Sequence, residues 1–403
     1  MRDAVIVDAV RTPLGKGKPG GAYSEVHPVE LHAHAIRSLV DRVPDLAPAE
    51  IDDVIGGAVA QVGEQSSNTT RYAALAAGLP ESVPGVTVDR QCGSSQQAIS
   101  FAAQGVIAGA YDIVVASGVE SMSRIPIGSQ AEVRGERVDV FGPTVADRYP
   151  GGLIPQGVSA ELIARRWNLS REQLDEFSYR SHQRAARAWR DGRFAAEVAP
   201  LKVTHGDGTV TTLDVDETVR PGTNLEVLAG LPTPFADPRW VERFGEFDWK
   251  VTAGSASPYN DGSAALLVTT SEVAAAHGWR PRARVHTTVV VGDDPIYMLT
   301  GIIPATAKAL AKAGLSISDI DAFEVNEAFA PVVLSWLKET GADPAKVNVN
   351  GGAISIGHPL GASGARLATT LLGVLEQTGG RYGLQTMCEA GGTANATIYE
   401  RLS

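Results

Sequence analysis

Cysteine is scarce in this chain, which has two cysteines in 403 residues. Cys92 and Cys388 are too few for a disulfide framework and lack the CxxC spacing of a zinc site, so we expect two free thiols. No run approaches the roughly 18 apolar residues that a membrane-spanning helix needs. The first residues, MRDAVIVDAVRTP, lack the architecture of a signal peptide. These absences predict a cytoplasmic protein that does not enter a membrane.

Basic residues are also few compared with acidic ones. The chain has 35 Lys and Arg against 46 Asp and Glu, a net charge of -11, which disfavours binding to nucleic acid and to anionic membrane surfaces. Any anionic ligand therefore needs a local basic patch. The content of 44% hydrophobic and 20% charged residues is typical of globular proteins, and the length suits two or three linked domains.

Short β-branched runs alternate with alanine-rich helical stretches, beginning with AVIVDAV, a helical stretch at 29–42 and DDVIGGAVA. This alternation indicates a layered α/β protein. It fades between about residues 121 and 250, where Arg171–Arg190 has the pattern of an amphipathic helix, and resumes with AALLVTT. We expect an N-terminal half at 1–120, completed by about 251–275, an inserted loop domain at 121–250 and a C-terminal half at 276–403.

An internal repeat supports two duplicated halves. Residues 46–52 (LAPAEID) match residues 315–321 (LSISDID) in spacing, and each segment leads from a helix into a strand. Each half then has a VxV strand, at 86–88 and 347–349, which enters a turn rich in Gly and Ser and then a helix. These helices, expected at 92–109 and 362–375, carry apolar or small residues on nearly every face. We therefore expect both to be buried on all sides, as a central layer.

Cys92 occupies a position suited to a nucleophile, in a turn between a buried strand and a helix start. Unpaired N–H groups and the positive end of the helix dipole favour a thiolate, so we expect the Cys92 pKa to fall from roughly 8.5 toward neutrality. The small neighbours in CGSS let a substrate approach. The alternative reading is a cysteine packed in the core.

Three further segments carry candidate acid–base groups. The loop 350–364 holds His358 among glycines and matches neither GxxxxGK[ST] nor GxGxxG, so phosphate cradles of those types are disfavoured. A histidine can accept a thiol proton and later donate to an oxyanion, although a structural histidine is the alternative. Cys388 ends a strand before glycines, as a second acid–base group. Asn326 follows a strand, where its amide can orient a water or an oxyanion or simply cap a helix.

Five blocks that span nearly the whole chain resemble the signature blocks of the thiolase family: DRQCGSSQQA, VTAGSASPYNDGSAALL, VNEAFA, NVNGGAISIGHPLGASG and CEAGG. The resemblance implies a five-layered α/β/α/β/α fold of two duplicated halves with an inserted loop domain, assembled as a homodimer or homotetramer. It implies cleavage of 3-ketoacyl-CoA by CoA to acetyl-CoA and a shortened acyl-CoA. Coenzyme A is then a substrate, and no cofactor or metal is expected.

The resemblance also implies a role for each matching residue. Cys92 becomes the acylated nucleophile, His358 its base, and Cys388 the acid–base group for the acetyl carbon and the CoA sulfur. Asn326, through a held water, and His358 line one oxyanion hole; the backbone N–H groups of Cys92 and Ala390 form the other. Ser257 and Arg220 match positions that contact CoA, and their alternative roles are loop hydrogen bonding and solvated charge.

The chain departs from the family pattern around its second cysteine, where it reads CEAGGTA. The family has Gly where Ala390 stands, and a positive φ there would cost alanine roughly 1 kcal/mol and displace the oxyanion hole. An unpaired carboxylate on Glu389 would raise the pKa of the neighbouring thiol. A catalytically weak protein that binds CoA or lipid is therefore an alternative function.

The segment LIPQGVSAE at 153–161 lacks the His-Met-Gly triplet of short-chain biosynthetic thiolases. The chain therefore resembles the degradative branch, that of β-oxidation, more closely than acetoacetyl-CoA-forming enzymes, which remain an alternative. A condensing synthase of the same superfamily is disfavoured, because that group pairs its cysteine with histidines rather than with a second cysteine such as Cys388.

Overall fold

The computed structural model describes residues 2–402, and ten of its strands form one continuous mixed sheet. The N-terminal half of the sheet has the order β1 (Val5–Arg11), β10 (Asn260–Thr269), β5 (Ile113–Ser121), β3 (Asp53–Gly57) and β4 (Gly85–Val88). The C-terminal half has the order β11 (Ala283–Gly292), β14 (Thr393–Arg401), β13 (Tyr382–Glu389) and β12 (Ala322–Val325). The halves join where β1 pairs with β11, and the short β2 (Gly15–Lys16) pairs with β10.

The two halves repeat the same topology. In each, the first two pairings counted from the joint, β1–β10–β5 and β11–β14–β13, are antiparallel, and the next, β5–β3 and β13–β12, is parallel. The repeat LAPAEID/LSISDID forms a 3-10 turn before a strand both times, at Pro48–Glu50 before β3 and at Ile317–Asp319 before β12. The predicted duplication is therefore confirmed.

The strand predicted at 347–349 is wrong, because only one bridge forms there, between Val347 and Phe323. The backbone of Asn348 turns away with φ 47°. Its side-chain amide instead bonds the N–H and C=O of Val325, at 2.9 Å each. A side chain thus replaces the strand ladder at the place that corresponds to β4.

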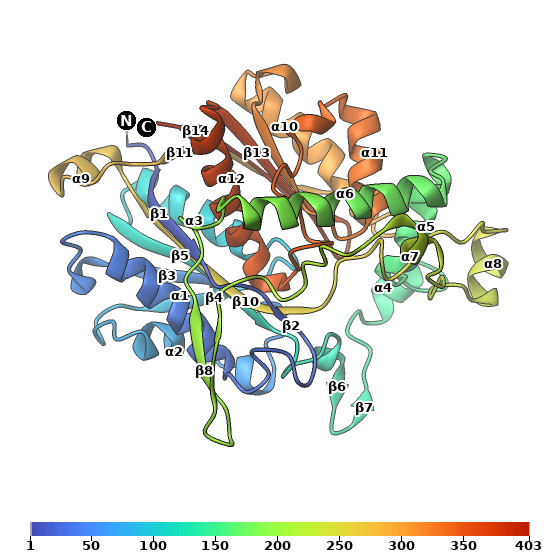
Figure 1. Ribbon diagram of the computed structural model, residues 1–403, viewed down its shortest axis with the longest axis horizontal. Coiled ribbons are helices and arrows are strands. Elements are labelled where there is room, and N and C mark those ends of the chain that lie inside the picture. Colours follow the sequence, from blue (N-terminus) through green and yellow to red (C-terminus); the bar gives the residue numbers. More distant parts are fainter. Residues whose placement is uncertain (1, 403) are drawn as a thin grey trace.

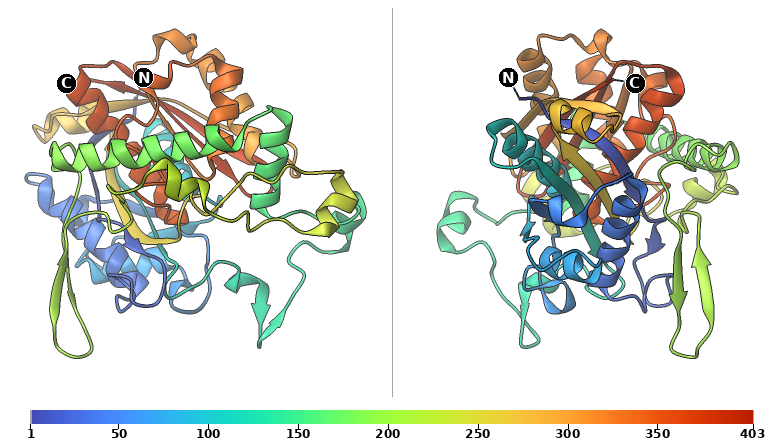
Figure 2. Two further views of the ribbon diagram at one scale, coloured as in Figure 1. Left: turned by 45° about the vertical axis from the view of Figure 1, so that its right-hand side comes forward. Right: turned by 90° about the vertical axis from the view of Figure 1, so that its left-hand side faces the viewer.

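Five layers of helices and strands are visible in Figures 1 and 2. The central layer consists of α3 (Ser94–Ala108) and α12 (Leu360–Thr378), which pack on each other and on strands of both halves. Helices α1 (Pro28–Arg42) and α2 (Thr69–Ala76) cover the N-terminal half, while α10 (Ile302–Ala313) and α11 (Ala330–Thr340) cover the C-terminal half. The five-layered α/β/α/β/α prediction is confirmed.

The central helices differ in burial. In α12 the residues from Gly361 to Leu372 are all buried, as predicted. In α3, Phe101 is 41% and Ile107 44% exposed, so the prediction of burial on all sides is wrong for this helix. The reason is its position beside β4, the last strand of the sheet, where Val86 is also 41% exposed. One edge of α3 lacks a covering element in the single chain.

The segment between β5 and β10 contributes no strand to the central sheet. It contains these elements: β6 (Glu132–Val133), β7 (Glu136–Arg137), α4 (Pro143–Arg148), α5 (Gln156–Arg166), α6 (Arg171–Arg190), β8 (Leu201–Thr204), β9 (Val210–Leu213), α7 (Leu225–Ala229) and α8 (Pro238–Phe244). The short α9 (Ser271–Ala276) follows β10. The predicted amphipathic helix has the bounds of α6, and Ser170 begins it with a capping box that includes Gln173.

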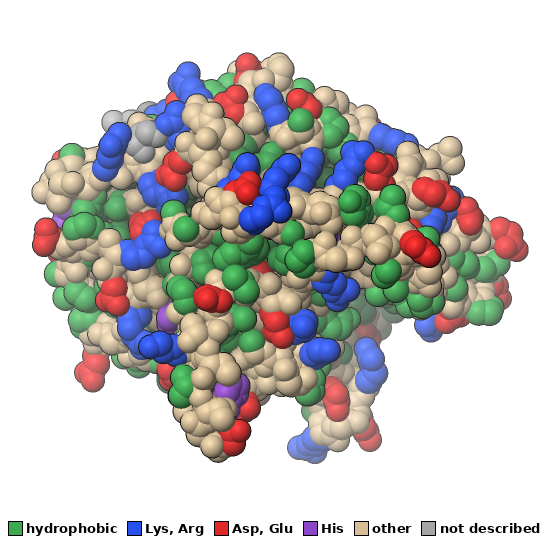
Figure 3. All heavy atoms as spheres, in the orientation of Figure 1, with side chains coloured by type: hydrophobic (Ala, Val, Ile, Leu, Met, Phe, Trp, Pro, Cys, Tyr) green, Lys and Arg blue, Asp and Glu red, His purple; other side chains and the backbone are tan. Residues whose placement is uncertain are grey.

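Buried ion pairs fix this segment to the sheet. The guanidinium of Arg11 on β1 contacts Glu197 at 2.6 Å and Asp216 at 2.7 Å, and all three side chains are buried. Figure 1 shows α6 lying across the front of the molecule, and Figure 3 shows basic side chains in the same region. The sequence of α6 includes Arg180, Arg184 and Arg187. Among residues 2–402, no helix is long and apolar enough to cross a membrane.

Candidate active site

Cys92 lies in the tight connection between β4 and α3. Gln91 has φ 48°, a left-handed conformation that is uncommon for residues other than glycine. The Ser94 hydroxyl holds this turn, because it accepts the N–H of Arg90 at 2.9 Å and donates to the Gln91 carbonyl at 2.6 Å. Cys92 is 3% exposed and lines a cavity. The turn thus presents one sulfur to an enclosed space at the start of α3.

The expected fall in the pKa of Cys92 is wrong for the free enzyme. Burial raises the pKa of this thiol well above its ordinary value, and negative charge on Cys388, Glu389 and Glu120 raises it further. Desolvation and like charge therefore outweigh the favourable end of α3. Cys92 is therefore a thiol at neutral pH, and a role as nucleophile would require a base to take its proton.

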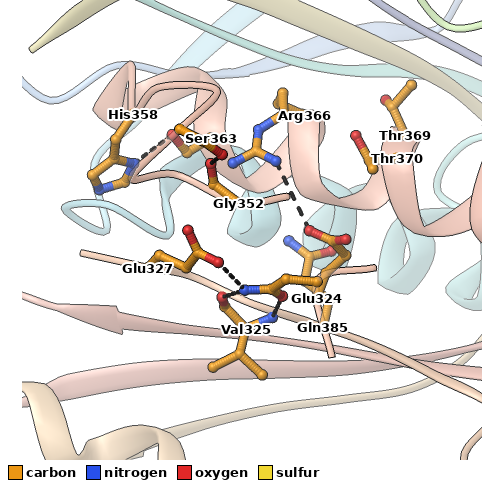
Figure 4. Close-up of polar contacts among 12 residues, drawn as sticks. Glu324, Val325, Glu327, Gly352, His358, Ser363, Arg366, Thr369, Thr370 and Gln385 are labelled. Carbon is orange, nitrogen blue, oxygen red and sulfur yellow. Dashed lines mark hydrogen bonds and ion pairs between the residues drawn. The ribbon is translucent and has the colours of Figure 1, made fainter. Parts of the chain in front are cut away.

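His358 precedes α12 and is held on two sides. Its backbone N–H donates to the Asn260 side chain at 3.0 Å, and its ring Nδ1 lies 2.6 Å from the Ser363 hydroxyl (Figure 4). The Ser363 hydroxyl donates its single proton to the Pro359 carbonyl at 2.8 Å. Nδ1 of His358 must therefore carry the proton in the hydrogen bond to Ser363, which leaves Nε2 unprotonated.

The imidazole of His358 is neutral in the resting site. Burial lowers its pKa to about 3, and the positive charge of Arg366, further along α12, acts in the same direction. A neutral imidazole with an unprotonated Nε2 can accept a proton from a thiol. The sequence-based assignment of His358 as a base is thus compatible with its environment.

Asn326 and Cys388 complete the site from the C-terminal half. Asn326 directly follows β12, and its Nδ2 lies 3.4 Å from Nε2 of His358. Cys388, next to last on β13, is fully buried, and burial raises its pKa to about 12; Glu389 raises it and a hydrogen bond from Asn326 lowers it. The two cysteines are close enough for charge on one to raise the pKa of the other. Both remain free thiols.

Ala390 does not adopt the strained backbone that the sequence leaves open. Positive φ occurs instead at the two residues that follow, 84° at Gly391 and 76° at Gly392. Ala390 and Gly391 line the same cavity as Cys92. The Ala390 N–H therefore stays in the site without the cost of a left-handed alanine.

The cavity beside Cys92 has a volume of about 300 Å³. Its lining is mainly apolar and comes largely from the segment after β5, including Ile125, Ile127, Phe141, Leu153 and Ile154. Glu120 supports the opposite wall, because its carboxylate accepts hydrogen bonds from the N–H groups of Val59, Ala60 and Gly361 and from the Gln65 amide, at 2.6 to 3.1 Å.

Sequence reasoning missed Glu120, Asn260 and Ser363 as supports of the site. Asn260 and Ser363 belong to the blocks SPYNDGS and GASG, so their position beside His358 in the fold was the missing information. Glu120 stands in the strand run VVASGVES, where a charged residue before a loop is an ordinary strand end. A buried carboxylate with four donors could be found only from the structure.

A second cavity of about 300 Å³ lies below α6 and is lined by His182, Thr218, Arg220, Leu228 and Pro258. Arg220 is exposed, and its N–H donates to His182. Ser257 is half-buried next to the lining residue Pro258, and its N–H donates to the Ala328 carbonyl at 3.0 Å. Lys16, Lys18 and Arg220 line an adjoining cavity. The acidic chain thus has a local basic patch here.

No cluster of three or more His, Cys, Asp or Glu side chains among residues 2–402 is arranged to hold a metal ion. Cys92 is instead linked to one further thiol, one amide and one imidazole: the charge of Cys388 acts on Cys92, Asn326 hydrogen bonds Cys388, and the His358 ring lies 3.4 Å from Asn326. Such a set can transfer protons and form a thioester, which is the chemistry of acyl transfer.

Family models match the chain over nearly its whole length: the thiolase N-terminal domain at residues 4–272 and the thiolase C-terminal domain at residues 279–401. The chain belongs to the thiolase family. This thiolase is 52% identical to a protein of Mycobacterium tuberculosis named steroid 3-ketoacyl-CoA thiolase, with 100% of this chain and 95% of the relative covered. It is 43% identical to a 3-ketoacyl-CoA thiolase of Erwinia tasmaniensis, with both chains fully covered.

A solved structure confirms the fold of this thiolase. The crystal structure of the Bacillus anthracis acetyl-CoA acetyltransferase matches with a TM-score of 0.89 and 38% identity, over 100% of this chain and 99% of the other. The relatives with the higher identities carry the name 3-ketoacyl-CoA thiolase, so the resemblance to the degradative branch is confirmed. The thiolase is an acyltransferase.

Proposed function

We propose that this thiolase cleaves 3-ketoacyl-CoA with CoA through an acyl-enzyme on Cys92. The observation that carries the proposal is a connected set of groups at the cavity where Cys92 lies. The buried Cys388 thiol is close enough for its charge to raise the pKa of Cys92, and Asn326 contacts both Cys388 and the unprotonated Nε2 of a neutral His358. The relatives named 3-ketoacyl-CoA thiolase support the substrate.

In the first half-reaction, Nε2 of His358 takes the Cys92 proton as the sulfur attacks the C3 ketone. The bond between C2 and C3 breaks, and the electron pair leaves on the enolate of acetyl-CoA. Cys388 gives its proton to that carbon and becomes a thiolate. Its pKa near 12 makes it a poor acid in the resting site, but an enolate is a strong enough base to take the proton.

In the second half-reaction, the Cys388 thiolate takes the proton of incoming CoA. The CoA sulfur attacks the acyl carbonyl, the bond to Cys92 breaks, and protonated His358 returns its proton to Cys92. Each proton donor is thus restored after one turnover. Two thiols are needed because one is covalently occupied when the other must transfer a proton.

Developing negative charge has two places of stabilisation in this proposal. The Asn326 amide, through a held water, and His358 stabilise the enolate oxygen. The backbone N–H groups of Cys92 and Ala390 stabilise the oxyanion formed at the attacked carbonyl. This arrangement is supported by the backbone of Ala390, which is not in the strained positive-φ region. Each preorganised donor of this kind lowers the activation free energy by about 3 kcal/mol.

The binding surfaces in this proposal come from segment 121–250 together with Lys16, Lys18 and Ser257, which lie outside it. The cavity below α6 accommodates the pantetheine arm beside Ser257, and the basic patch of Lys16, Lys18 and Arg220 accommodates CoA phosphates. The apolar cavity at Ile127, Phe141 and Leu153 takes the acyl group, which favours chains longer than acetoacetyl. The name of the Mycobacterium tuberculosis relative supports a steroid-derived acyl group as one candidate.

We also propose a homo-oligomer, a dimer at the least. The outer edge of the N-terminal half exposes Tyr72, Val86, Phe101 and Ile107, each more than 40% exposed, beside the free edge of β4. An exposed strand edge flanked by large apolar residues is a favourable surface for pairing with a second copy. Dimer and tetramer are both compatible with this surface.

The test is the CoA-dependent loss of the magnesium-enolate absorbance of acetoacetyl-CoA and of longer or steroid-derived 3-ketoacyl-CoA substrates. We expect turnover by the wild type, faster with the bulkier acyl groups, and none by Cys92→Ala. No turnover by the folded wild type at any chain length would contradict thiolysis and favour a protein that only binds CoA or lipid.

A further inference from the structure

Glu389 is an ionisable group that acts on both cysteines, and the proposed reaction gives it no task. It follows Cys388 on β13, and consecutive residues of a strand point to opposite faces. Cys388 packs with the core of the C-terminal half, whereas Met387, on the same face as Glu389, packs with Cys92 and Leu367 of the central layer. The carboxyl of Glu389 is therefore directed toward the start of α3.

The carboxyl lies directly against the nucleophile's turn. A Cβ atom on Gly93 would stand 1.9 Å from Oε1 and 2.8 Å from Cδ of Glu389, so a side chain at residue 93 would force the Glu389 carboxyl to move. Gly93 follows Cys92 and begins α3 as its N-cap residue. The Asn395 amide donates to the Gly93 carbonyl at 3.3 Å on the same side. Glu389 and Gly93 thus form one packing unit behind the Cys92 sulfur.

No basic side chain within residues 2–402 forms an ion pair with Glu389, which is 0% exposed. The groups that face it are Thr393, its partner on β14, and Asp89 and Arg90 in the turn before α3. Burial raises the pKa of Glu389 to about 8; Asp89 adds to this, whereas Thr393 and Arg90 oppose it. The carboxyl is therefore neutral at pH 7.

We propose that Glu389 is a positioning residue that serves as a neutral carboxylic acid: it supports the turn at Gly93 and, only while protonated, lets Cys92 and Cys388 become thiolates in turn. This proposal rests on the thiolysis proposed above. A protonated carboxyl adds no charge beside the sulfurs, but an ionised one disfavours each thiolate by repulsion. Glu120, which also raises the pKa of Cys92, faces the sulfur from β5 and keeps its four donors in either case.

The consequence is a loss of thiolysis at alkaline pH. As Glu389 ionises near pH 8, a negative charge appears beside both cysteines at the pH where thiolates would otherwise become more abundant. We expect kcat of the wild type to fall above that pH. In Glu389→Gln, the side chain has the shape of the neutral acid but cannot ionise. The fall in kcat should therefore move to higher pH or disappear.

A substrate-free measurement separates this proposal from the thiolysis itself. Wild type and Glu389→Gln are treated with iodoacetamide between pH 6 and 10, and alkylation of the Cys92 and Cys388 peptides is followed by mass spectrometry. We expect the midpoint for Cys92 in Glu389→Gln to be lower by about one pH unit, and its alkylation at pH 9 to be several times faster. Glu161→Gln is the control, because it replaces another buried carboxyl, on α5, away from both cysteines. Its alkylation midpoints should match those of the wild type.

Unchanged alkylation midpoints in Glu389→Gln would overturn the proposal whether or not the enzyme turns over 3-ketoacyl-CoA. An unchanged alkaline limb of kcat would overturn it as well. Glu389→Met, which is uncharged and of similar length, provides a second variant. If both variants fail to fold at pH 7, a neutral group at this position is insufficient and the proposal is equally contradicted.

Discussion

At the scale of single residues, the state of His358 is decided by a serine one turn into α12. The Ser363 hydroxyl has one proton, and the Pro359 carbonyl accepts it, so Nδ1 of the imidazole has to be the donor in the 2.6 Å contact between ring and hydroxyl. This fixes the unprotonated nitrogen at Nε2, toward Asn326. In the proposed mechanism, the tautomer that lets His358 accept the thiol proton is therefore set by the Ser363 hydroxyl.

Ser363→Ala tests this dependence. Without the acceptor for Nδ1–H, the imidazole can change tautomer and rotate, so we expect kcat to fall by about 100-fold with little change in KM. The measurement is steady-state thiolysis. Ser335→Ala is a matched control, because Ser335 is also a buried helical serine whose hydroxyl donates to a carbonyl within its own helix. An equal fall of kcat in both variants would indicate a general packing defect rather than a role in fixing the tautomer.

The CEAGG turn provides a second pair of variants. Ala390 is outside the positive-φ region, so Ala390→Gly should leave kcat within about two-fold and lower the free energy of unfolding by about 0.5 to 1 kcal/mol through the unfolded chain. Gly391 has φ 84° and open space at its Cβ position, so Gly391→Ala should cost about 1 to 2 kcal/mol through backbone strain alone. Urea denaturation measures both changes. A larger cost for Ala390→Gly than for Gly391→Ala would contradict the backbone assignment.

At the scale of elements, Glu120 at the end of β5 joins three parts of the chain. Its carboxylate receives the backbone N–H groups of Val59 and Ala60 after β3, the amide of Gln65, and the N–H of Gly361 at the start of α12. The Glu120 carboxylate therefore holds both the lining of the cavity at Cys92 and the helix that follows His358.

Glu120→Gln should disturb both. An amide retains one acceptor oxygen and presents hydrogens to buried donors, so we expect a loss of about 2 to 3 kcal/mol of stability and a higher KM for long acyl substrates. The control is Glu50→Gln, where an exposed carboxylate accepts one N–H, from Ala47, and a loss below about 1 kcal/mol is expected. Urea denaturation and a KM comparison check these results, and an equal loss in the two variants would argue against a special role of Glu120.

The elements show how far the sequence can predict this molecule. Periodicity and repeated spacing predicted the duplicated halves, the central helices and the bounds of α6, because each depends on local patterns of apolar residues. The strand expected at 347–349 failed because Asn348 pairs with Val325 through its side chain, a contact between residues distant in sequence. The prediction that α3 is buried on all sides failed for a related reason. An exposed apolar residue such as Phe101 gives the same sequence pattern as a buried one.

For the candidate site, the sequence predicted which residues take part but not their protonation states. The positions of Cys92, His358, Asn326 and Cys388 followed from motifs. In the structure, Asn326 contacts both Cys388 and His358, and the charge of Cys388 acts on Cys92. The pKa of Cys92 did not follow, because the helix end is a local feature whereas burial and the acidic neighbours come from the tertiary fold. Sequence patterns thus located the groups but could not give the electrostatic environment that sets their protonation.

At the scale of the whole molecule, buried titratable groups give stability a definite pH dependence. Burial lowers the pKa of His32 and His358 to about 3 and that of His182 to about 4, below the ordinary 6.5. The unfolded chain therefore binds more protons there, and stability increases as pH rises to 6.5. Burial raises the pKa of Glu161 to about 7 and of Glu389 to about 8, above 4.5, so the folded protein binds more protons and stability decreases as pH rises from 4.5 to 8.

The histidine and carboxyl contributions to stability oppose each other below pH 6.5. Above pH 6.5, only the carboxyl contribution still changes with pH. Glu389 and Glu161 together hold protons over about two pH units between pH 6.5 and 8.5, so we expect the free energy of unfolding to fall by about 3 kcal/mol there. Glu324, whose pKa burial raises to about 8, makes the fall larger. Urea denaturation at a series of pH values measures this. Stability that is constant or increasing over that interval would contradict the burial of neutral carboxyls.

The central claim is that the Cys92 sulfur becomes esterified by the acyl group of the substrate. Protein mixed with a 3-ketoacyl-CoA in the absence of free CoA, quenched with acid and digested, should show the mass of the shortened acyl group on the peptide that contains Cys92, because the thiol that resolves the intermediate is missing. The Cys388 peptide should be unmodified, and Cys92→Ala should show no added mass. A folded wild type whose Cys92 peptide never gains the acyl mass, or that gains it on Cys388 instead, would contradict the account.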